Sequence, residues 1–471
     1  MPGSRLPTTT DLHATLRIFL PLSLASLGSI GIGITDSIML GHLGTDALGA
    51  AGLALSVYGM LFMVGHGVLF PVMVLVSHVH GSNRSRTAPR IIRQGLWAAG
   101  ILSVPSLAVL WNLENILLLA RQETNLARMA GRYMDYHLWT LLPAFTFSVF
   151  GFASIAMERG GIITRIVWFQ LGLNIVLDYG LIFGNFGFPA MGMAGAGLAS
   201  VLVWGAGHTI FFAFFSFHRF YRSRARFRYA WWPRWRIIRR IFYMGWPKGL
   251  EQMVQSGLFA TIALLIGWRL GVEAIAAHTI ALQVYPVAHM VISWTIASAV
   301  TTRVGIASGA DDYTNIWRIL NAGLLVCFFF LLPLAALLKV FSPWVVMLFL
   351  GSELKAQALL PIASPLLVIV AFFILADGLR VIAGYALNGL SDMRMPALMM
   401  GLGHWGIGFP AALVFGLGMD FGILGLWWGL TVGMAAIGIL YLARFRWLVE
   451  RLTVATSGED RARVSHDEIA S

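Results

Sequence analysis

Four carboxylic acids stand inside long apolar stretches of the sequence: Asp36, Asp178, Glu251 and Asp377. An ionisable side chain at the centre of a membrane-spanning helix costs about 2.5–3.5 kcal/mol on insertion scales, so such residues commonly mark the path of an ion or a substrate. Carboxylates can take up a proton or hold a hard cation through their oxygen atoms. These four acids are therefore the first candidates for a functional role.

Two of the acids are expected to share one polar layer in the first half of the chain. At a rise of about 1.5 Å per residue, Asp36 lies about 6 Å, Asp178 about 9 Å, Asn174 about 15 Å and Ser200 about 12 Å below the outer ends of their apolar runs. Asn174 and Asp178 are four residues apart and so share a helix face. We expect these four residues to form a proton- or cation-coupling site, in which Asp36, Asn174 and Asp178 would hold Na⁺ if the ion is sodium. The alternative, strongest for Ser200, is that each group only hydrogen-bonds a neighbouring helix.

Glu251, Gln255 and Asp377 are the candidates in the second half of the chain. Glu251 lies about 16 Å and Asp377 about 18 Å from the inner ends of their runs, so both are expected near the middle of the membrane. Gln255 is one helical turn from Glu251 on the same face. Two acids at matched depth predict an acidic patch that attracts cations and takes up protons. The alternative for Glu251 is that Lys248, three residues before it, neutralises the carboxylate.

Two prolines, Pro21 and Pro247, lie inside apolar runs, where a missing backbone N–H permits a kink. A bend at Pro21 would displace Asp36, so this proline could couple the protonation of Asp36 to the shape of its helix. A static kink is the alternative.

The composition indicates a polytopic membrane protein. Hydrophobic residues make up 58% and charged residues 11% of the chain, against about 45–50% and about 25% in soluble domains. The net charge of +12 comes from basic residues between apolar runs, so nucleic-acid binding is not expected. The single cysteine, Cys327, excludes an intramolecular disulfide. The sequence has no P-loop, HEXXH or GXSXG motif, and we expect neither a cofactor nor an enzymatic activity.

Twelve apolar runs approach the length of about 20 residues that a membrane-spanning helix needs. They cover residues 16–40, 47–79, 94–117, 137–157, 162–184, 193–217, 241–267, 274–301, 318–341, 359–388, 396–417 and 422–446. The expected fold class is therefore an all-α membrane protein with twelve transmembrane helices.

The chain repeats itself. Residues 43–58 (LGTDALGAAGLALSVY) and 270–285 (LGVEAIAAHTIALQVY) are identical at eight of sixteen positions. Gly192 and Gly195 have counterparts in Gly422 and Gly425. The repeat predicts two pseudo-symmetric lobes of six helices. The expected organisation is an N-lobe over 1–217, a basic connector over 218–240, a C-lobe over 241–446 and a polar tail over 447–471.

Basic residues indicate the orientation in the membrane. The connector carries nine arginines, and its tryptophans suit a helix lying at the membrane surface. Most other basic loops fall on the same side, so both termini are expected in the cytoplasm and the protein in the plasma (inner) membrane. One loop, residues 118–136, disagrees because it holds three arginines. The tail after Arg451 has few bulky apolar residues and is expected to be disordered.

Several segments resemble the multidrug and toxic compound extrusion (MATE) family. TDSIMLGHLGTDALGAAGLA resembles the acid of its first helix and the following loop, and LNIVLDYGLIFGNFGFPAMGMAGAGLAS its fifth and sixth helices. GWPKGLEQ, LGVEAIAAHTIAL and ADGLRVIAGYALNGLSDMRMP resemble signatures of its second half. The likeness covers nearly all of residues 12–446.

The resemblance implies two six-helix lobes that form a V around a central cavity, and export by alternating access. It also implies a cation site at Asp36, Asn174, Asp178 and Ser200, where serine replaces the expected threonine. Asp377 matches an acid of the second lobe in part of the family. Gln255 stands where some members carry glutamate, which makes the N-lobe the better candidate for coupling.

The leading hypothesis is a secondary antiporter, expected to be a monomer, that exports amphipathic, often cationic drugs or metabolites in exchange for H⁺ or Na⁺. One alternative is a flippase for lipid-linked precursors, for which a basic cavity lining would be expected. A membrane-embedded enzyme would need a catalytic cluster, and an ion channel would conduct without a coupled gradient.

Overall fold

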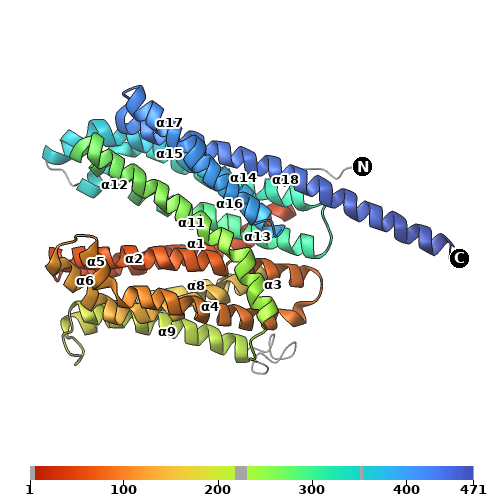
Figure 1. The fold of residues 1–471 in the computed structure, drawn as a ribbon, viewed down its shortest axis with the longest axis horizontal. Coiled ribbons are helices and arrows are strands. Elements are labelled where there is room, and N and C mark those ends of the chain that lie inside the picture. Colours follow the sequence, from red (N-terminus) through yellow and green to blue (C-terminus); the bar gives the residue numbers. More distant parts are fainter. Residues whose placement is uncertain (1–5, 218–230, 351–353, 470–471) are drawn as a thin grey trace. The chain divides into compact units, whose positions relative to one another are not determined.

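The computed structural model describes residues 6–217, 231–350 and 354–469, and every regular element in these ranges is helical (Figure 1). The helices are α1 (Thr9–Gly41), α2 (Thr45–Leu69), α3 (Pro71–Gly81), α4 (Ala88–Trp111), α5 (Leu113–Leu119), α6 (Thr124–His137), α7 (Leu141–Ala156), α8 (Gly161–Phe183), α9 (Met193–Phe217), α11 (Trp235–Arg269), α12 (Gly271–Ala288), α13 (Trp294–Gly309), α14 (Ile316–Leu350), α15 (Leu354–Gly389), α16 (Arg394–Gly401), α17 (Phe409–Leu413) and α18 (Gly422–Ile469). Short 3₁₀ turns, η1 (Ser85–Thr87) and η2 (Leu138–Thr140), and π-helical turns, η3 (His289–Ser293), η4 (Leu402–Gly408) and η5 (Val414–Gly418), join some of them.

The described residues contain twelve helical stretches long and apolar enough to cross a membrane. Each corresponds to one of the twelve runs of the sequence, so the expected all-α transmembrane fold class is confirmed. Some spans contain more than one element. For example, α2 and α3 together form the span Thr45–Gly81, which Pro71 interrupts because a proline lacks the N–H of a continuous helix.

The fourth span begins earlier than the sequence predicted. It extends over Thr124–Ala156 rather than 137–157, so most of the expected loop 118–136 is the helix α6. That helix carries Arg128, Arg132 and Asp135, and these charges lower the mean hydropathy of the helix. A criterion based on apolar runs therefore misses it.

The chain packs as two compact units. The N-unit comprises Pro21–His80 and Arg84–Met253, and the C-unit comprises the described parts of Met1–Leu20, Gly81–Asn83 and Val254–Ser471. These packing units differ from the two halves of the repeat, because α1 and α11 each contribute to both. The switch in α1 falls between Leu20 and Pro21.

An ion-pair cluster in the C-unit explains why the beginning of α1 belongs there. Asp11 of α1 pairs with Arg303 of α13 at 3.0 Å and with Arg318 of α14 at 2.7 Å. Arg303 also donates to the Thr15 hydroxyl one turn further along α1, at 2.7 Å. These contacts hold the first turns of α1 against two helices of the second half of the chain.

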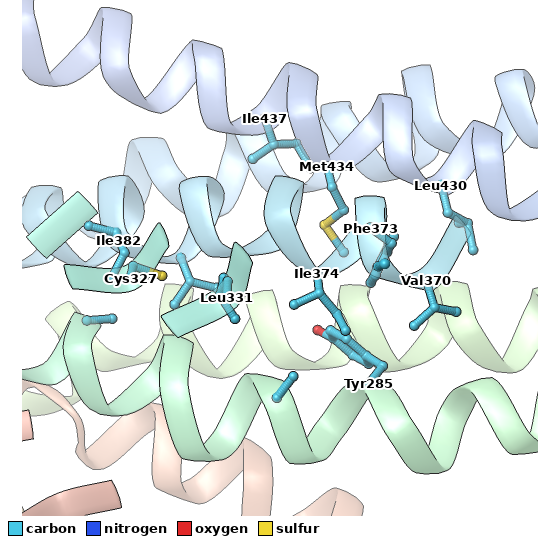
Figure 2. Close-up of a cluster of buried hydrophobic side chains, with 14 of the residues drawn as sticks. Tyr285, Cys327, Leu331, Val370, Phe373, Ile374, Ile382, Leu430, Met434 and Ile437 are labelled. Carbon is cyan, nitrogen blue, oxygen red and sulfur yellow. The ribbon is translucent and has the colours of Figure 1, made fainter. Parts of the chain in front are cut away.

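The core of the C-unit is formed mainly by apolar side chains of α11–α15 and α18. Figure 2 shows Tyr285 of α12 beside Phe373 and Ile374 of α15, with Leu430 and Met434 of α18 on the other side of α15. Cys327 of α14 is buried in the same cluster, as a small apolar residue would be.

The repeat is visible in the backbone as well as in the sequence. Gly44 directly precedes α2 and Gly271 is the first residue of α12, and their φ values are 119° and 84°. Gly192 directly precedes α9 and Gly422 is the first residue of α18, and their φ values are 56° and 57°. Glycine adopts this left-handed region without the steric cost that a Cβ atom imposes. The paired glycines therefore mark equivalent turns in the two halves.

Gly195 and Gly425 are a second equivalent pair, which allows helices to approach closely. A Cβ atom on Gly195 would overlap the carbonyl oxygen of Leu181 on α8, and one on Gly425 would overlap that of Phe415 in η5. Because the obstructing atoms belong to the backbone, they cannot move aside as a flexible side chain can.

Gly195→Ala is therefore expected to separate α8 from α9 and to lower the stability by about 1–3 kcal/mol, the range for overpacked cores. Gly205→Ala on the same helix is the matched control, because its Cβ would meet no atom within 4 Å. The control is expected to be neutral or slightly stabilising, since alanine favours a helix. Thermal unfolding of the two variants in detergent measures the difference, and equal unfolding temperatures would contradict the expectation.

Two peripheral segments differ from the sequence predictions. The tail expected to be disordered after Arg451 is helical, because α18 continues to Ile469. Extending an existing helix avoids the cost of nucleation, which a prediction from composition alone does not consider. Residues 218–230 of the basic connector lie outside the described residues. The described residues 231–234 are not helical, so the expected surface helix is not found in that part, and Trp235 begins α11.

Candidate functional site

In the N-unit, one asparagine joins two of the intramembrane acids. The Asn174 Nδ2 group on α8 donates to Asp36 Oδ1 on α1 at 2.8 Å and to Asp178 Oδ2 on α8 at 3.1 Å. Asn174 and Asp178 are almost fully buried, and Asp36 is half-buried. The two carboxyl groups also lie close enough to interact electrostatically with each other. The structure thus brings together three of the four residues expected in this layer.

Two oxygen atoms of this group are buried without a hydrogen-bond partner among the described residues. They are Asn174 Oδ1 and Asp178 Oδ1. A buried acceptor without a donor is costly, so it calls for an additional group. A proton on Asp178 or a sodium ion among the oxygens would supply what is missing. The donor set of carboxylate and amide oxygens suits a hard cation of this kind.

Ser200 does not join the other three residues. It is buried in α9, which packs along α8, but it makes no hydrogen bond to Asp36, Asn174 or Asp178 in the described part of the chain. Depth along a helix therefore predicted its burial correctly, and its part in the cation site stays a prediction.

Tyr133 of α6 is a residue of this site that the sequence interpretation missed. It is buried and lies close enough to Asp36 and Asp178 to interact with both electrostatically. Its hydroxyl forms a hydrogen bond of 3.0 Å with His137 Nδ1, one turn further along the helix. The signal that could have revealed it is the four-residue spacing of two polar aromatic residues on one face of α6.

The candidates Glu251 and Gln255 of α11 lie in different environments. Glu251 Oε1 pairs with Lys248 Nζ at 2.8 Å, and both side chains are buried in the N-unit. The alternative that Lys248 neutralises Glu251 is therefore confirmed. Gln255 belongs to the C-unit, where its Nε2 donates to the Tyr285 hydroxyl at 3.3 Å.

Asp377 of α15, the third candidate of the second half, is also compensated. Its Oδ1 accepts hydrogen bonds from Arg380 Nη2 at 2.6 Å and Arg380 Nε at 3.0 Å. Its Oδ2 lies 2.7 Å from His289 Nδ1. Glu251 and Asp377 thus each have a basic partner in their own unit, and the expected midplane acidic patch stays a prediction.

The two prolines lie where the sequence placed them, inside α1 and α11. The switch of α1 between the units falls directly before Pro21. The Pro21 carbonyl also accepts a hydrogen bond from the Thr164 hydroxyl on α8, four residues into that helix. A role of either proline in coupling ion binding to helix shape stays a prediction.

A family model described as MatE matches residues 21–180 and 247–414 of this chain. A relative described as a probable multidrug resistance protein NorM, from Agrobacterium fabrum, is 32% identical, and the alignment covers 93% of this chain and 94% of the relative. A relative of the same description from Rhizobium meliloti is 34% identical over 95% of each chain.

Solved structures share the fold. A transporter of the MOP superfamily from Pyrococcus furiosus has a TM-score of 0.84 at 18% identity, covering 94% of this chain and 97% of that one. The eukaryotic MATE transporter AtDTX14 has a TM-score of 0.81 at 17% identity, covering 94% of this chain and 99% of that one. At these identities the likeness is one of fold.

Proposed function

Since this chain belongs to the MATE family, we propose that it is a secondary active antiporter. It exports amphipathic, often cationic small molecules, and the inward movement of H⁺ or Na⁺ drives the export. The observation that carries this proposal is the buried trio Asp36, Asn174 and Asp178, in which two acceptor oxygens have no partner among the described residues.

The trio supports ion exchange because its charge depends on what occupies it. Two ionised carboxylates in a low-dielectric site repel each other, and one proton or one Na⁺ relieves that repulsion. An ion shifts a conformational equilibrium only if it binds one conformation more tightly than the other. A site built from both α1 and α8 meets this condition if the separation of the two helices changes during transport. Alternating access of the two units is therefore part of the proposal.

The substrate class follows from the relatives and from the charges of the membrane region. The relatives from Agrobacterium and Rhizobium are described as probable multidrug resistance proteins. Intramembrane acids attract organic cations, and exchange for H⁺ or Na⁺ would preserve charge. We place the protein in the plasma (inner) membrane as a monomer with both termini in the cytoplasm, with no nucleic-acid partner and no cofactor. A flippase for lipid-linked precursors would be expected to have a basic cavity lining, whereas the buried Lys248 and Arg380 each pair with an acid.

Reconstitution with one gradient at a time tests the proposal. Purified protein in liposomes is given an H⁺ gradient or a Na⁺ gradient, with the membrane potential clamped by potassium and valinomycin. The probe is tetraphenylphosphonium, a lipophilic cation. We expect one of the two gradients to drive the probe uphill, which also identifies the coupling ion.

Protein-free liposomes and liposomes without a gradient are the controls. If neither gradient moves the probe uphill, the antiport proposal is wrong. Currents that persist without any coupled gradient would instead indicate a channel.

A further inference from the structure

The C-unit contains a second polar cluster, formed by His289 of α12–η3 and by Asp377 and Arg380 of α15. We propose that His289 is a proton-binding site of this transporter, and that Asp377 and Arg380 hold its imidazole in place instead of binding a coupling ion themselves. This inference rests on the proposed antiport and adds a titratable group in the second half of the chain.

The geometry leaves Asp377 little capacity for a cation. One carboxylate oxygen accepts two hydrogen bonds from the Arg380 guanidinium, at 2.6 and 3.0 Å, and the other lies 2.7 Å from the imidazole. The side chains of Asp377 and Arg380 are 1% and 4% exposed. A metal ion would have to displace an arginine that is itself buried, which would leave that charge without compensation. Asp377 and Arg380 therefore form a fixed neutral pair.

His289 differs from its two partners in being accessible. Its side chain is 23% exposed. Because Nδ1 faces a carboxylate, that nitrogen carries the proton in the neutral ring, and Nε2 is the atom that gains or loses a proton. No hydrogen bond to Nε2 is found among the described residues. The imidazole can thus exchange a proton on its outer edge while its inner edge stays bound.

The other groups around the cluster of His289, Asp377 and Arg380 do not compensate an added positive charge. Tyr285 on α12 places its hydroxyl 3.3 Å from His289 Nδ1, and Gln255 on α11 donates to that hydroxyl. Cys327 on α14 and His404 in η4 are buried and interact electrostatically with Asp377. None of these four carries a negative charge near neutral pH that would offset a proton on His289. Protonation of His289 therefore changes the cluster from neutral to a net charge of +1.

Aromatic side chains line the side of the His289–Asp377–Arg380 cluster where Tyr285 lies. The Tyr285 ring packs against Phe373 with ring centres 5.0 Å apart and against Phe259 at 5.8 Å. Figure 2 shows Tyr285 beside Phe373 and Ile374 within this apolar cluster. A charge next to such a dry wall is weakly screened, so its effect on a nearby organic cation is stronger than in water.

The backbone at His289 supports a functional reading. This residue opens the π-helical turn η3, which extends over His289–Ser293 between α12 and α13. Single π-helical turns within α-helices are rare and occur frequently at functional sites. The irregular turn presents His289 to the carboxylate of a residue 88 positions away in sequence.

The first test observes the proton directly. The ring nitrogens of the twelve histidines are labelled with ¹⁵N in the full-length protein in nanodiscs, and the His289 signal is identified by its absence in His289→Gln. We expect its ring to gain a proton as the pH is lowered through the range in which the protein stays folded. A His289 ring that stays neutral throughout that range would overturn the proposal.

The second test measures equilibrium binding of tetraphenylphosphonium against pH. If the cation binds about 10 Å from His289, a unit charge at an effective dielectric constant of about 20 predicts binding weaker by on the order of tenfold when His289 is protonated. His289→Gln should keep the tight binding at low pH, and His289→Lys should show weak binding at every pH. His278→Gln is the control, because His278 lies on the preceding helix α12, is buried, and contacts Trp427 instead of Asp377. This control should retain the pH dependence of the wild type.

A variant of the N-unit separates this inference from the proposed antiport and does not require a His289 variant to fold. In Asp36→Asn/Asp178→Asn, the carboxylates of the N-unit can no longer titrate. A remaining pH dependence of binding supports His289 as a second proton site, and its complete loss overturns the proposal. Failure of the antiport itself would appear differently, as the absence of gradient-driven transport by the wild type.

Discussion

Replacing Asp36 with asparagine is expected to reduce gradient-driven transport of tetraphenylphosphonium to the rate of protein-free liposomes. The amide oxygen of the new residue can still accept the hydrogen bond that Asn174 donates to Asp36 Oδ1 at 2.8 Å. The contact between α1 and α8 is therefore retained. What is lost is a group that can release a proton or contribute a negative charge to bound Na⁺. Initial rates in liposomes with the gradient identified for the wild type measure the effect.

Asp46→Asn is the matched control for this prediction, because Asp46 is an exposed acid in the first turn of α2. It should transport at the wild-type rate. Asp178→Asn should resemble Asp36→Asn, and the double variant should be no worse than either, since residues that act as one unit are not additive. Equilibrium binding of the probe should persist in Asp36→Asn. Wild-type rates in this variant would refute the role assigned to the trio.

The location of this trio could be predicted because it depends on two regular properties of helices. The rise per residue places Asp36 and Asp178 at similar depth, and the spacing of four residues places Asn174 and Asp178 on one face. Ser200 is buried as the same depth rule predicts, but no hydrogen bond joins it to these three residues in the described part of the chain. The rotation of α9 about its axis depends on the packing of glycines such as Gly195 against α8, which no single-helix rule contains.

Tyr133 shows a different limit of sequence reasoning. Its helix carries three charged residues and fails a criterion of continuous hydropathy, although Tyr133 itself is 1% exposed. The helix α6 buries one face, which carries Tyr133, and its charged residues Arg128, Arg132 and Asp135 are exposed. Its amphipathic pattern, rather than its mean hydropathy, would have indicated a helix before residue 137.

Two buried ion pairs, Lys248–Glu251 and Asp377–Arg380, show which contacts the sequence could predict. Lys248 and Glu251 are three residues apart, and that spacing correctly suggested their ion pair. Asp377 and Arg380 have the same spacing and form an equally buried pair, which the same rule would have predicted. The contact of Asp377 with His289 could not be predicted in this way, because it joins α15 to a π-helical turn that has no recognised sequence signature.

Replacing Arg380 with methionine is expected to destabilise the protein by about 3–5 kcal/mol, the cost of removing one partner from a buried ion pair. The Asp377 carboxylate, which is 1% exposed, would keep its charge without the guanidinium that now binds Oδ1. If His289 takes up a proton, its positive charge partly replaces that of Arg380. The destabilisation should therefore be smaller at pH 5.5 than at pH 8, which is the opposite of a general loss of stability in acid. Thermal unfolding in detergent at both pH values measures this difference.

Two further variants define what the Arg380→Met result means. Arg380→Met/Asp377→Asn removes both charges and should recover most of the lost stability, because a neutral polar pair is far cheaper to bury than one isolated charge. Arg446→Met is the matched control for an arginine in an ion pair, since Arg446 and Glu450 are 64% and 52% exposed and their contact should matter little. A destabilisation by Arg380→Met that is equal at the two pH values would show that His289 does not compensate Asp377. The charge of the C-unit would then be fixed, and ion coupling would rest on Asp36 and Asp178 alone.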